Sequence, residues 1–373
     1  MKIVMIFIAF LFASLLFATD FTVTSMPEVQ RKSPPEDVKN IPFGTVFSDH
    51  MFVMKWNEQK GWHEARIEPY HAFTFDPASL HLHYGTEIFE GMKAFKNNQG
   101  KVVLFRPGEH LKRMNRSAVR MMMPEIDASF AEKALKRLLQ EDKRWVPSQP
   151  GTSLYIRPTM IASQNTINLV VSNEYLFYII MSPVGALYSK GFKPTAILVS
   201  DQYTRSSIGG VGDVKTGGNY AASMKAQSEA KKAGYDQVLW LDPVKRQYVE
   251  EVGSMNIFFV INGKLVTPEL TGTILPGITR QSVLELSRAN GWKVVERKIS
   301  IQEVIKAIKN GSCTEIFGTG TAAVISSIGK LKYKDREYSI ASKPDSFTLK
   351  IYETITGIQQ GRILDTFRWI SEI

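Results

Sequence analysis

Residues 211–220 read V-G-D-V-K-T-G-G-N-Y and place a single lysine, Lys215, among several glycines. Glycine has no side chain, so a chain rich in it can adopt left-handed angles and approach a bulky group closely. A lysine that must reach a ligand, desolvated and with a lowered pKa, has use for such surroundings, whereas a solvated lysine does not. Two interpretations fit: Lys215 forms a Schiff base with a carbonyl cofactor or substrate, or it lies in a glycine-rich surface turn. This stretch by itself leaves both open.

The same stretch does not have the pattern of a nucleotide-binding loop. A P-loop needs a glycine directly before its lysine, but residues 209–216 end in V-K-T. No G-x-G-x-x-G with a downstream acidic residue follows a predicted strand either. These observations disfavour nucleoside triphosphate binding.

Three other motifs fit together if the ligand of Lys215 is a phosphorylated aromatic aldehyde. Residues 275–280, L-P-G-I-T-R, turn tightly and open a predicted helix whose first amides could hold a phosphate. Residues 318–323, G-T-G-T-A-A, follow a predicted strand and offer the hydroxyl and amide of Thr321. Residues 250–256, E-E-V-G-S-M-N, place two carboxylates beside a turn. Each motif by itself is common in turns and caps that merely connect secondary-structure elements. Their combination with Lys215 is a more specific indication of a cofactor site.

Composition indicates a globular protein that binds small molecules. The chain has 373 residues, 44% of them hydrophobic and 22% charged, which is enough material for two domains. Its net charge is +10, but lysines and arginines are scattered, which disfavours nucleic acid and fits anionic metabolites. Cys313 is the single cysteine, so no intrachain disulfide can form, and the histidines show no metal-binding pattern. We expect no metal site.

The first forty residues are expected to lie outside the fold. Residues 1–18 join one lysine to an apolar run, as in a secretory signal, and are short for a membrane span; alternatively, translation begins at Met26. We expect a cytoplasmic protein, or an exported or membrane-tethered one if residues 1–18 are a genuine signal. The predicted division is an N-terminal extension (1–40), a small α/β domain (41–182), an interdomain loop (183–191) and a large domain (192–373).

Apolar spacing predicts strands and helices in both halves of the chain. Residues 80–95 combine a strand-like start with a helix-like centre, and a turn at 97–100 then leads into a strand, so this region should form a hairpin. The predicted strands are residues 51–56, 101–105, 154–161, 175–181, 195–200, 237–241, 257–261, 292–297 and 314–317. The predicted helices are residues 110–123, 129–140, 220–233, 279–289 and 301–309. The fold class is α/β or α+β, with mixed sheets in two unequal parts.

Eight segments resemble, in order and spacing, the branched-chain amino acid aminotransferases, which are fold-type-IV pyridoxal-phosphate enzymes. They are H-Y-G-T-E-I-F-E-G-M-K-A-F, L-F-R-P, L-K-R-M-N-R-S-A, S-L-Y-I-R-P, G-D-V-K-T-G-G-N-Y, E-V-G-S-M-N-I-F, L-P-G-I-T-R-Q-S and F-G-T-G-T-A-A. The resemblance implies a two-domain fold, with a small mixed α/β domain and a larger, pseudo-barrel-like α/β domain. It also implies pyridoxal 5′-phosphate as the cofactor and a homodimer as the assembly.

The resemblance assigns cofactor roles to residues of these segments. Lys215 would form the Schiff base and shuttle a proton between the substrate α-carbon and the cofactor. Glu251 would pair with the pyridine nitrogen, and Tyr220 would hydrogen-bond the ring hydroxyl. Arg113, otherwise an ordinary solvated helix arginine, would bring positive charge to the phosphate. The further residues expected to contact the cofactor are Ser254, Asn256, Leu275, Gly277, Ile278, Thr279 and Thr321.

The implied reaction transfers the amino group of L-leucine, L-isoleucine or L-valine to 2-oxoglutarate, so one pocket must accept apolar and acidic side chains. Arg157 would receive the side-chain carboxylate of glutamate. The amides of Thr321 and Ala322 would bind the α-carboxylate. Aromatic residues in apolar strands are often core residues, but the resemblance implies that the apolar wall of the pocket is formed by Tyr84, Phe89 and Tyr155.

Two kinds of alternative remain open. Within the same fold, a D-amino acid aminotransferase or an aminodeoxychorismate lyase would use a similar cofactor site, although S-L-Y-I-R-P and F-E-G-M-K-A-F favour the branched-chain group. Outside enzymology, an exported or membrane-tethered binding protein would fit the apolar N-terminus. The presence of Lys215, Glu251, Tyr220 and Arg113 together argues against a protein that has lost catalysis.

Overall fold

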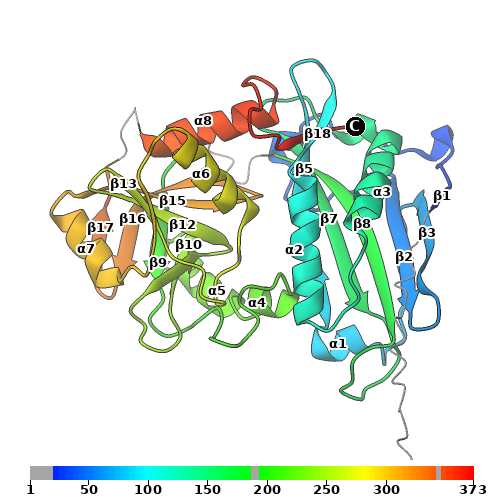
Figure 1. Ribbon diagram of the computed structural model, residues 1–373, viewed down its shortest axis with the longest axis horizontal. Coiled ribbons are helices and arrows are strands. Elements are labelled where there is room, and N and C mark those ends of the chain that lie inside the picture. Colours follow the sequence, from blue (N-terminus) through cyan, green and yellow to red (C-terminus); the bar gives the residue numbers. More distant parts are fainter. Residues whose placement is uncertain (1–19, 186–192, 342–345) are drawn as a thin grey trace, which may run out of the picture.

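The computed structural model describes residues 20–185, 193–341 and 346–373 and builds them on two β-sheets that lie side by side (Figure 1). The first sheet has strand β4 (Glu87–Phe89) paired with β7 and otherwise follows one continuous order. In space this order is β1 (Thr22–Val23), β3 (Gly61–Pro69), β2 (His50–Asn57), β8 (Glu174–Val184), β7 (Ser153–Ala162), β5 (Met92–Lys96), β6 (Val102–Phe105) and β18 (Ile370–Glu372).

The second sheet closes on itself. Its order is β11 (Val249–Val252), β10 (Gln237–Leu241), β9 (Thr195–Val199), β16 (Val324–Tyr333), β15 (Cys313–Gly320), β12 (Met255–Ile261), β13 (Lys264–Thr267) and β14 (Val294–Glu296), with β17 (Arg336–Ser339) on β16. Because β11 also pairs with β12, the strands from β11 to β12 form a closed barrel. The larger, barrel-like part that the resemblance implied is therefore confirmed.

The helices pack around these two sheets (Figure 1). Beside the first sheet lie α1 (Leu80–Tyr84), α2 (Pro107–Arg120) and α3 (Ala128–Glu141). The second half of the chain supplies α4 (Gly217–Ala221), α5 (Met224–Lys232), α6 (Ile278–Ala289), α7 (Ile301–Lys309) and α8 (Phe347–Gln359).

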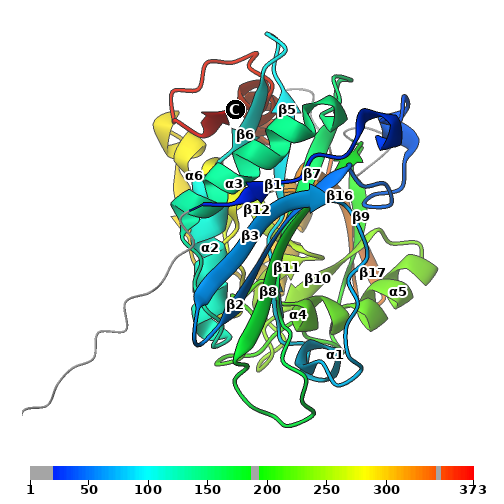
Figure 2. The same cartoon turned by 90° about the vertical axis from the view of Figure 1, so that its right-hand side faces the viewer.

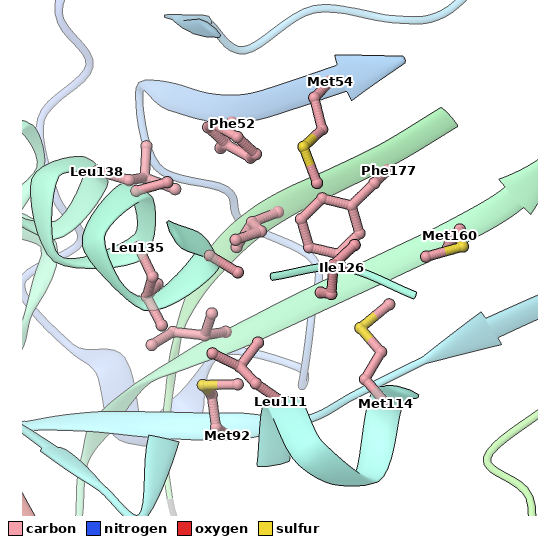
Figure 3. Close-up of a cluster of buried hydrophobic side chains, with 14 of the residues drawn as sticks. Phe52, Met54, Met92, Leu111, Met114, Ile126, Leu135, Leu138, Met160 and Phe177 are labelled. Atoms are coloured by element: carbon pink, nitrogen blue, oxygen red, sulfur yellow. The ribbon is translucent and has the colours of Figure 1, made fainter. Parts of the chain in front are cut away.

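Helices α2 and α3 pack on one face of the first sheet because each carries an apolar stripe at helical spacing. Helix α3 begins where the Asp127 carboxylate accepts hydrogen bonds from the Ser129 and Phe130 amides, as an N-cap does. Burying a side chain such as leucine or methionine contributes roughly 1.5–3 kcal/mol. Figure 3 shows the resulting core, in which helix residues face strand residues: Leu111, Met114, Leu135, Leu138, Phe52, Met54, Met160 and Phe177.

The barrel has an inner and an outer core, as the alternation of side chains along a strand requires. On β12, Ile257 and Phe259 belong to a buried cluster to which all strands of the barrel contribute, so this cluster fills the interior. The intervening Phe258 and Val260 belong to a second cluster with α6, α8 and the first-sheet strands β5 and β6. This second cluster joins the two halves of the molecule.

Both ends of the described chain belong to the first sheet, which differs from the predicted division. Residues 20–40 were expected outside the fold, yet β1 pairs with β3, and the ring of Phe21 packs against Phe52 and Phe130. The C-terminal strand β18 was assigned to the large domain, but it pairs with β6 (Figure 2). Neither short strand is recognisable by local pattern, because each is stabilised by the sheet edge on which it lies.

Two secondary-structure predictions were wrong in detail. Residues 80–95 begin as helix α1 and continue as strands β4 and β5, the reverse of the expected order. Gly85 at φ 60° ends α1, and the chain is extended beyond it. The single helix predicted over residues 220–233 is two helices, α4 and α5. The predicted hairpin of β5 and β6 and most other elements are confirmed.

The apolar N-terminus and most of the predicted interdomain loop lie outside the part of the chain that the structure describes. Strand β8 extends to Val184, and residues 186–192 and 1–19 lie outside the described residues. The predicted boundary at 183–191 and the cytoplasmic location therefore stay predictions. Among the helices that are described, none has the length and apolar character needed to cross a membrane.

The Glu315 side chain of β15 caps helix α8, and this contact generates a stability prediction. Its buried carboxylate accepts hydrogen bonds from the amides of Phe347 and Thr348, at 2.9 and 2.8 Å, and from the Thr348 hydroxyl at 2.6 Å. Removing it leaves these donors without a partner, so we expect Glu315→Ala to lower the free energy of unfolding by about 2 kcal/mol. Urea unfolding measures this, with the exposed Glu353→Ala as the control. Equal unfolding midpoints for the two variants would contradict the assignment.

Candidate active site

A cavity of about 850 Å³ lies between the two halves of the molecule. Strands β4, β7 and β8 of the first sheet form one side, and the glycine-rich segment before α4, the start of α6 and the end of β15 form the other. With the exception of Tyr84, every predicted site residue lines it. These are Phe89, Arg113, Tyr155, Arg157, Lys215, Tyr220, Glu251, Ser254, Asn256, Leu275, Gly277, Ile278, Thr279, Thr321 and Ala322.

Lys215 extends into this cavity from a backbone that contacts the first sheet and α2. Its carbonyl accepts a hydrogen bond from the Phe89 amide at 3.0 Å, and its amide donates to the Ser117 hydroxyl at 3.1 Å. Its ammonium donates to the Tyr220 hydroxyl at 2.8 Å and lies 4.6 Å from the centroid of the Phe89 ring. Lys215 is therefore a fixed cavity residue rather than part of a solvated turn.

Two glycines near Lys215 are required by close packing. A β-carbon on Gly217 would lie 1.9 Å from a carboxylate oxygen of Glu87, and one on Gly212 would lie 2.6 Å from the Thr273 carbonyl oxygen. Any larger residue would displace these neighbours. Glu87 lines the cavity and was missed by sequence reasoning, because nothing in its local pattern separates it from an ordinary strand carboxylate.

Glu251, on β11, is buried with its carboxylate at the cavity. Adjacent residues of a strand point to opposite sides, so Glu250 instead accepts a hydrogen bond from the Thr273 hydroxyl at 2.6 Å. Glu251 accepts from the Asn256 side chain at 3.1 Å and the Leu275 amide at 3.2 Å. Burial raises the pKa of Glu251 to about 7, against the opposing effect of the nearby Arg205.

Arg205 forms an ion pair with Glu251 at 2.5 Å and was not identified from the sequence. Its guanidinium also donates to the carbonyls of Gly212 and Thr273, at 2.8 and 3.0 Å. Arg205 thus connects the carboxylate to the segment that carries Lys215. It lies ten residues before that lysine, in a stretch without periodicity, so no sequence signal marked it.

Arg113 is buried, so it is not a solvated helix arginine. Its Nε and Nη2 donate to the two carboxylate oxygens of Glu90 at 2.7 and 2.9 Å, and its Nη1 donates to the Pro276 carbonyl at 3.2 Å. Glu90 also bonds the His110 ring at 2.8 Å. Glu90 and His110 were missed, although the spacing of His110 and Arg113 on one helix places them on the same face.

These contacts hold Arg113 charged at the cavity. Although burial opposes its charge, the Glu90 carboxylate raises the pKa of Arg113 above its ordinary value. Burial would raise the pKa of Glu90, but Arg113 and His110 bring it well below the usual range. The guanidinium has five N–H donors, so it can still donate to an anion in the cavity.

The start of α6 provides the second anion-binding feature. Gly277 is its N-cap residue and has no side-chain cap, and the amides of Ile278 and Thr279 follow it at the cavity. A β-carbon on Gly277 would lie 2.0 Å from the Asn256 amide oxygen, while the Asn256 nitrogen donates to the Leu275 carbonyl at 2.8 Å. The helix start is therefore positioned firmly, and its partial positive charge suits a phosphate.

The first sheet supplies a polar group within an aromatic wall. The Arg157 guanidinium lies 4.5 Å from the Phe89 ring centroid and 5.3 Å from that of Tyr155, and it donates to the Tyr155 hydroxyl at 3.0 Å. The ring of Phe43 packs edge-on against Tyr155 at 4.9 Å. A β-carbon on Gly91 would lie 2.1 Å from the Tyr155 hydroxyl oxygen, so the glycine leaves room for this ring. A substrate side chain would meet both apolar and cationic surface.

Tyr84 is the one predicted site residue that the fold leaves outside the cavity. It ends helix α1, is 44% exposed, and donates its hydroxyl to the Ile167 carbonyl at 2.6 Å. The resemblance placed Tyr84 in the substrate wall through its motif, but the motif does not determine the direction of the side chain.

The residues at the cavity fit a phosphorylated pyridine aldehyde. The start of α6 and Arg113 suit the phosphate, the Lys215 amine suits the aldehyde, and Glu251 is a carboxylate with a raised pKa that can pair with a ring nitrogen. The buried Thr319 hydroxyl, which lines the cavity, has no hydrogen-bond partner among the described residues. No cluster of three potential metal ligands occurs in the described part of the chain.

Family comparison agrees with this set of groups: the chain belongs to the class IV aminotransferases, whose family profile matches residues 87–331. It is 48% identical to branched-chain-amino-acid aminotransferase 2 of Bacillus subtilis, covering 92% of this chain and 94% of that protein. It is 42% identical to the branched-chain-amino-acid aminotransferase of Mycolicibacterium smegmatis, covering 95% and 98%.

Solved structures agree at the level of the fold. The branched-chain aminotransferase of Thermoproteus uzoniensis, solved with norvaline, aligns with a TM-score of 0.72 at 26% identity, covering 86% of this chain and 99% of that one. The branched-chain amino acid aminotransferase of Thermobaculum terrenum, solved in its PLP form, aligns with a TM-score of 0.71 at 26% identity, covering 86% and 97%.

The raised pKa of Glu251 predicts a pH-dependent stability of the cofactor-free protein. The folded state keeps this proton up to about pH 7, whereas the unfolded chain releases it near 4.5, so stability falls as pH rises between these values. Relative to Glu251→Gln, we expect the free energy of unfolding to fall by on the order of 3 kcal/mol across this window. Urea unfolding of both proteins from pH 4 to pH 8 measures the difference. Parallel curves would contradict the prediction, because groups common to both proteins cancel.

Proposed function

We propose that this protein is a pyridoxal 5′-phosphate-dependent aminotransferase that exchanges the amino group of L-leucine, L-isoleucine or L-valine with 2-oxoglutarate, giving branched-chain 2-oxo acids and L-glutamate. The observation that carries the proposal is the hydrogen bond that the Lys215 ammonium donates to the Tyr220 hydroxyl at 2.8 Å. It lies in a cavity that Glu251 and Arg113 also line. When bound, the cofactor supplies an electron-withdrawing ring that stabilises negative charge at the substrate α-carbon.

The cavity residues would hold this cofactor by its three polar parts. Arg113, the amides at the start of α6 and Thr321 would hold the phosphate. Glu251 would pair with the ring nitrogen, and Tyr220 would bond the ring hydroxyl. The remaining contacts with the cofactor would come from Ser254, Asn256, Leu275 and Gly277.

Lys215 would carry the proton during the reaction. Its Nζ would accept the proton from the substrate α-carbon and would pass it to the carbon of the cofactor that carries the aldehyde group. The Tyr220 hydroxyl keeps Nζ in one position, and the two backbone hydrogen bonds of Lys215 fix the base of the side chain. This preorganisation lowers the cost of reaching the reactive geometry.

The pocket next to the cofactor would alternate between two kinds of side chain. Phe89 and Tyr155 would contact the aliphatic side chain of leucine, isoleucine or valine, and Arg157 would meet the carboxylate of glutamate. The rings of Phe89 and Tyr155 lie next to the Arg157 guanidinium, so one surface can serve both substrates. The relatives at 42–50% identity favour this substrate class over a D-amino acid aminotransferase or an aminodeoxychorismate lyase.

We also propose that the protein is a homodimer. The Tyr84 hydroxyl bonds the Ile167 carbonyl, and the two segments that this contact joins expose apolar side chains that a monomer would leave in water, namely Leu82, Ile167, Leu169 and Val171. A second copy covering this region would bury these residues beside Gly85, which lines the 850 Å³ cavity. The role of Tyr84 in the substrate wall stays a proposal that depends on such an assembly.

The first test of this function is a steady-state assay with L-leucine and 2-oxoglutarate. We expect formation of L-glutamate. With D-alanine, kcat/KM should be at least roughly 100-fold lower than with L-leucine, because only the L-enantiomer presents its α-proton to Lys215. Absence of L-leucine turnover would exclude the proposed substrate class.

A matched pair of lysine variants completes this test. Lys215→Ala should lose transamination, whereas Lys225→Ala, which removes a lysine from the exposed surface of α5, should keep it. Borohydride reduction of the wild-type holoenzyme should attach the cofactor covalently to the peptide that contains Lys215, as measured by mass spectrometry. Appreciable turnover by Lys215→Ala would refute the role of this lysine.

Arg157 generates a prediction about substrate selectivity. Arg157→Met removes the cation but keeps much of the apolar length, so we expect KM for 2-oxoglutarate and L-glutamate to rise roughly 10- to 100-fold, the loss of one charge-assisted hydrogen bond. KM for L-leucine should change far less. Arg116→Met, on the exposed side of α2, is the control. An equal rise for leucine and glutamate would show that Arg157 supports the pocket as a whole.

A further inference from the structure

The turn of residues 321–323 separates two cavities. Ala322 and Ala323 line the large cavity on one side and a second cavity of about 80 Å³ on the other. The residue after the turn, Val324, has φ 59°, a strained conformation for a β-branched residue that must be held by its surroundings.

Lys93 supports this turn from the opposite sheet. It lies in β5, directly beside Tyr155 in the strand register, and its side chain is buried. Its ammonium donates to the Ala322 carbonyl at 2.8 Å. None of the carboxylates in the described residues forms an ion pair with it. Burial lowers the pKa of Lys93 to about 8, so the amine is still charged at neutral pH.

The peptide geometry relates this contact to the cavity. In a trans peptide the carbonyl and the following amide point in opposite directions. With the Ala322 carbonyl directed at Lys93, the Ala323 amide points away from Lys93. The amides of Thr321, Ala322 and Ala323 have no backbone hydrogen-bond partner among the described residues, so they are available to a ligand.

We propose that Lys93 is a positioning residue for the substrate α-carboxylate: its ammonium holds the Ala322 carbonyl and so fixes the peptide between Ala322 and Ala323, whose amide is directed away from Lys93 and is available to the carboxylate. The inference rests on the proposed function, because the α-carboxylate is the group that every amino acid and 2-oxo acid substrate shares. A hydrogen bond from a charged donor also polarises the peptide and strengthens its amide as a donor to an anion. The contact further links the turn, in the barrel, to the strand beside the substrate wall.

The test compares an unreactive acid with its neutral amide. Calorimetry of the holoenzyme measures the binding of 4-methylpentanoate and of 4-methylpentanamide to wild type, Lys93→Met, Lys93→Gln and Lys93→Arg. We expect Lys93→Met to weaken acid binding by about 10-fold or more, from the loss of a charge-assisted hydrogen bond, and amide binding by less than about 3-fold. Lys93→Arg should recover much of the acid affinity. Lys96→Met, at the exposed end of the same strand, is the matched control.

Steady-state kinetics give a second readout. In Lys93→Met, KM for L-leucine, L-glutamate and 2-oxoglutarate should rise by a similar factor, since all three carry the same carboxylate, in contrast to the selective effect at Arg157. An equal loss of acid and amide binding would overturn the proposal, because Lys93 would then only support the fold; unchanged acid binding would overturn it as well. If Lys93→Met does not fold, the ratio of acid to amide binding in Lys93→Gln and Lys93→Arg decides. Failure of wild type to bind the acid or to transaminate leucine would instead reject the proposed function itself.

Discussion

Two backbone hydrogen bonds of Lys215 determine the geometry on which the rest of the site depends. One joins its carbonyl to the Phe89 amide of β4, and the other joins its amide to the Ser117 hydroxyl of α2. The lysine is covalently part of the half of the chain that builds the barrel, but the first sheet and its helix decide where it lies. A hydrogen bond within a buried site contributes modest net stability, yet leaving its donor unpaired is costly, so such contacts select one arrangement.

The charged groups around the cavity are arranged in pairs that span separate segments. Arg205 contacts Glu251 and the Gly212 carbonyl, and Arg113 contacts Glu90 and the Pro276 carbonyl. Burying single charges would cost several kcal/mol each, and the partners offset that cost. Each arginine therefore joins two separate segments of the chain, while a charged group stays at the surface of the cavity. Lys93 differs because its partner is a carbonyl, which leaves its charge uncompensated next to the turn at the end of β15.

Local pattern was sufficient for the elements and motifs that carry their own signal. The helix over residues 301–309 and the strands around Tyr155 and Tyr178 follow from apolar periodicity, and the lysine, glycine and carboxylate motifs predicted a common site that the fold brings together. Prediction failed where the deciding contact is distant in sequence. Strands β1 and β18 form on the edges of a sheet made by other residues, and Glu87, Glu90 and Arg205 act through partners that no spacing reveals.

The sequence by itself determined the chemical groups of the site, because residue type and spacing decide which amine, carboxylate and phosphate-binding amides are present. It also determined the order of most strands and helices, since that depends on short-range apolar patterning. Only the tertiary structure decided which groups face one another. It paired Glu251 with Arg205, left Tyr84 outside the cavity, and set Lys93 behind the turn of residues 321–323. The physical reason is that side-chain direction follows from strand register and sheet pairing, which are set by contacts between residues far apart in the chain.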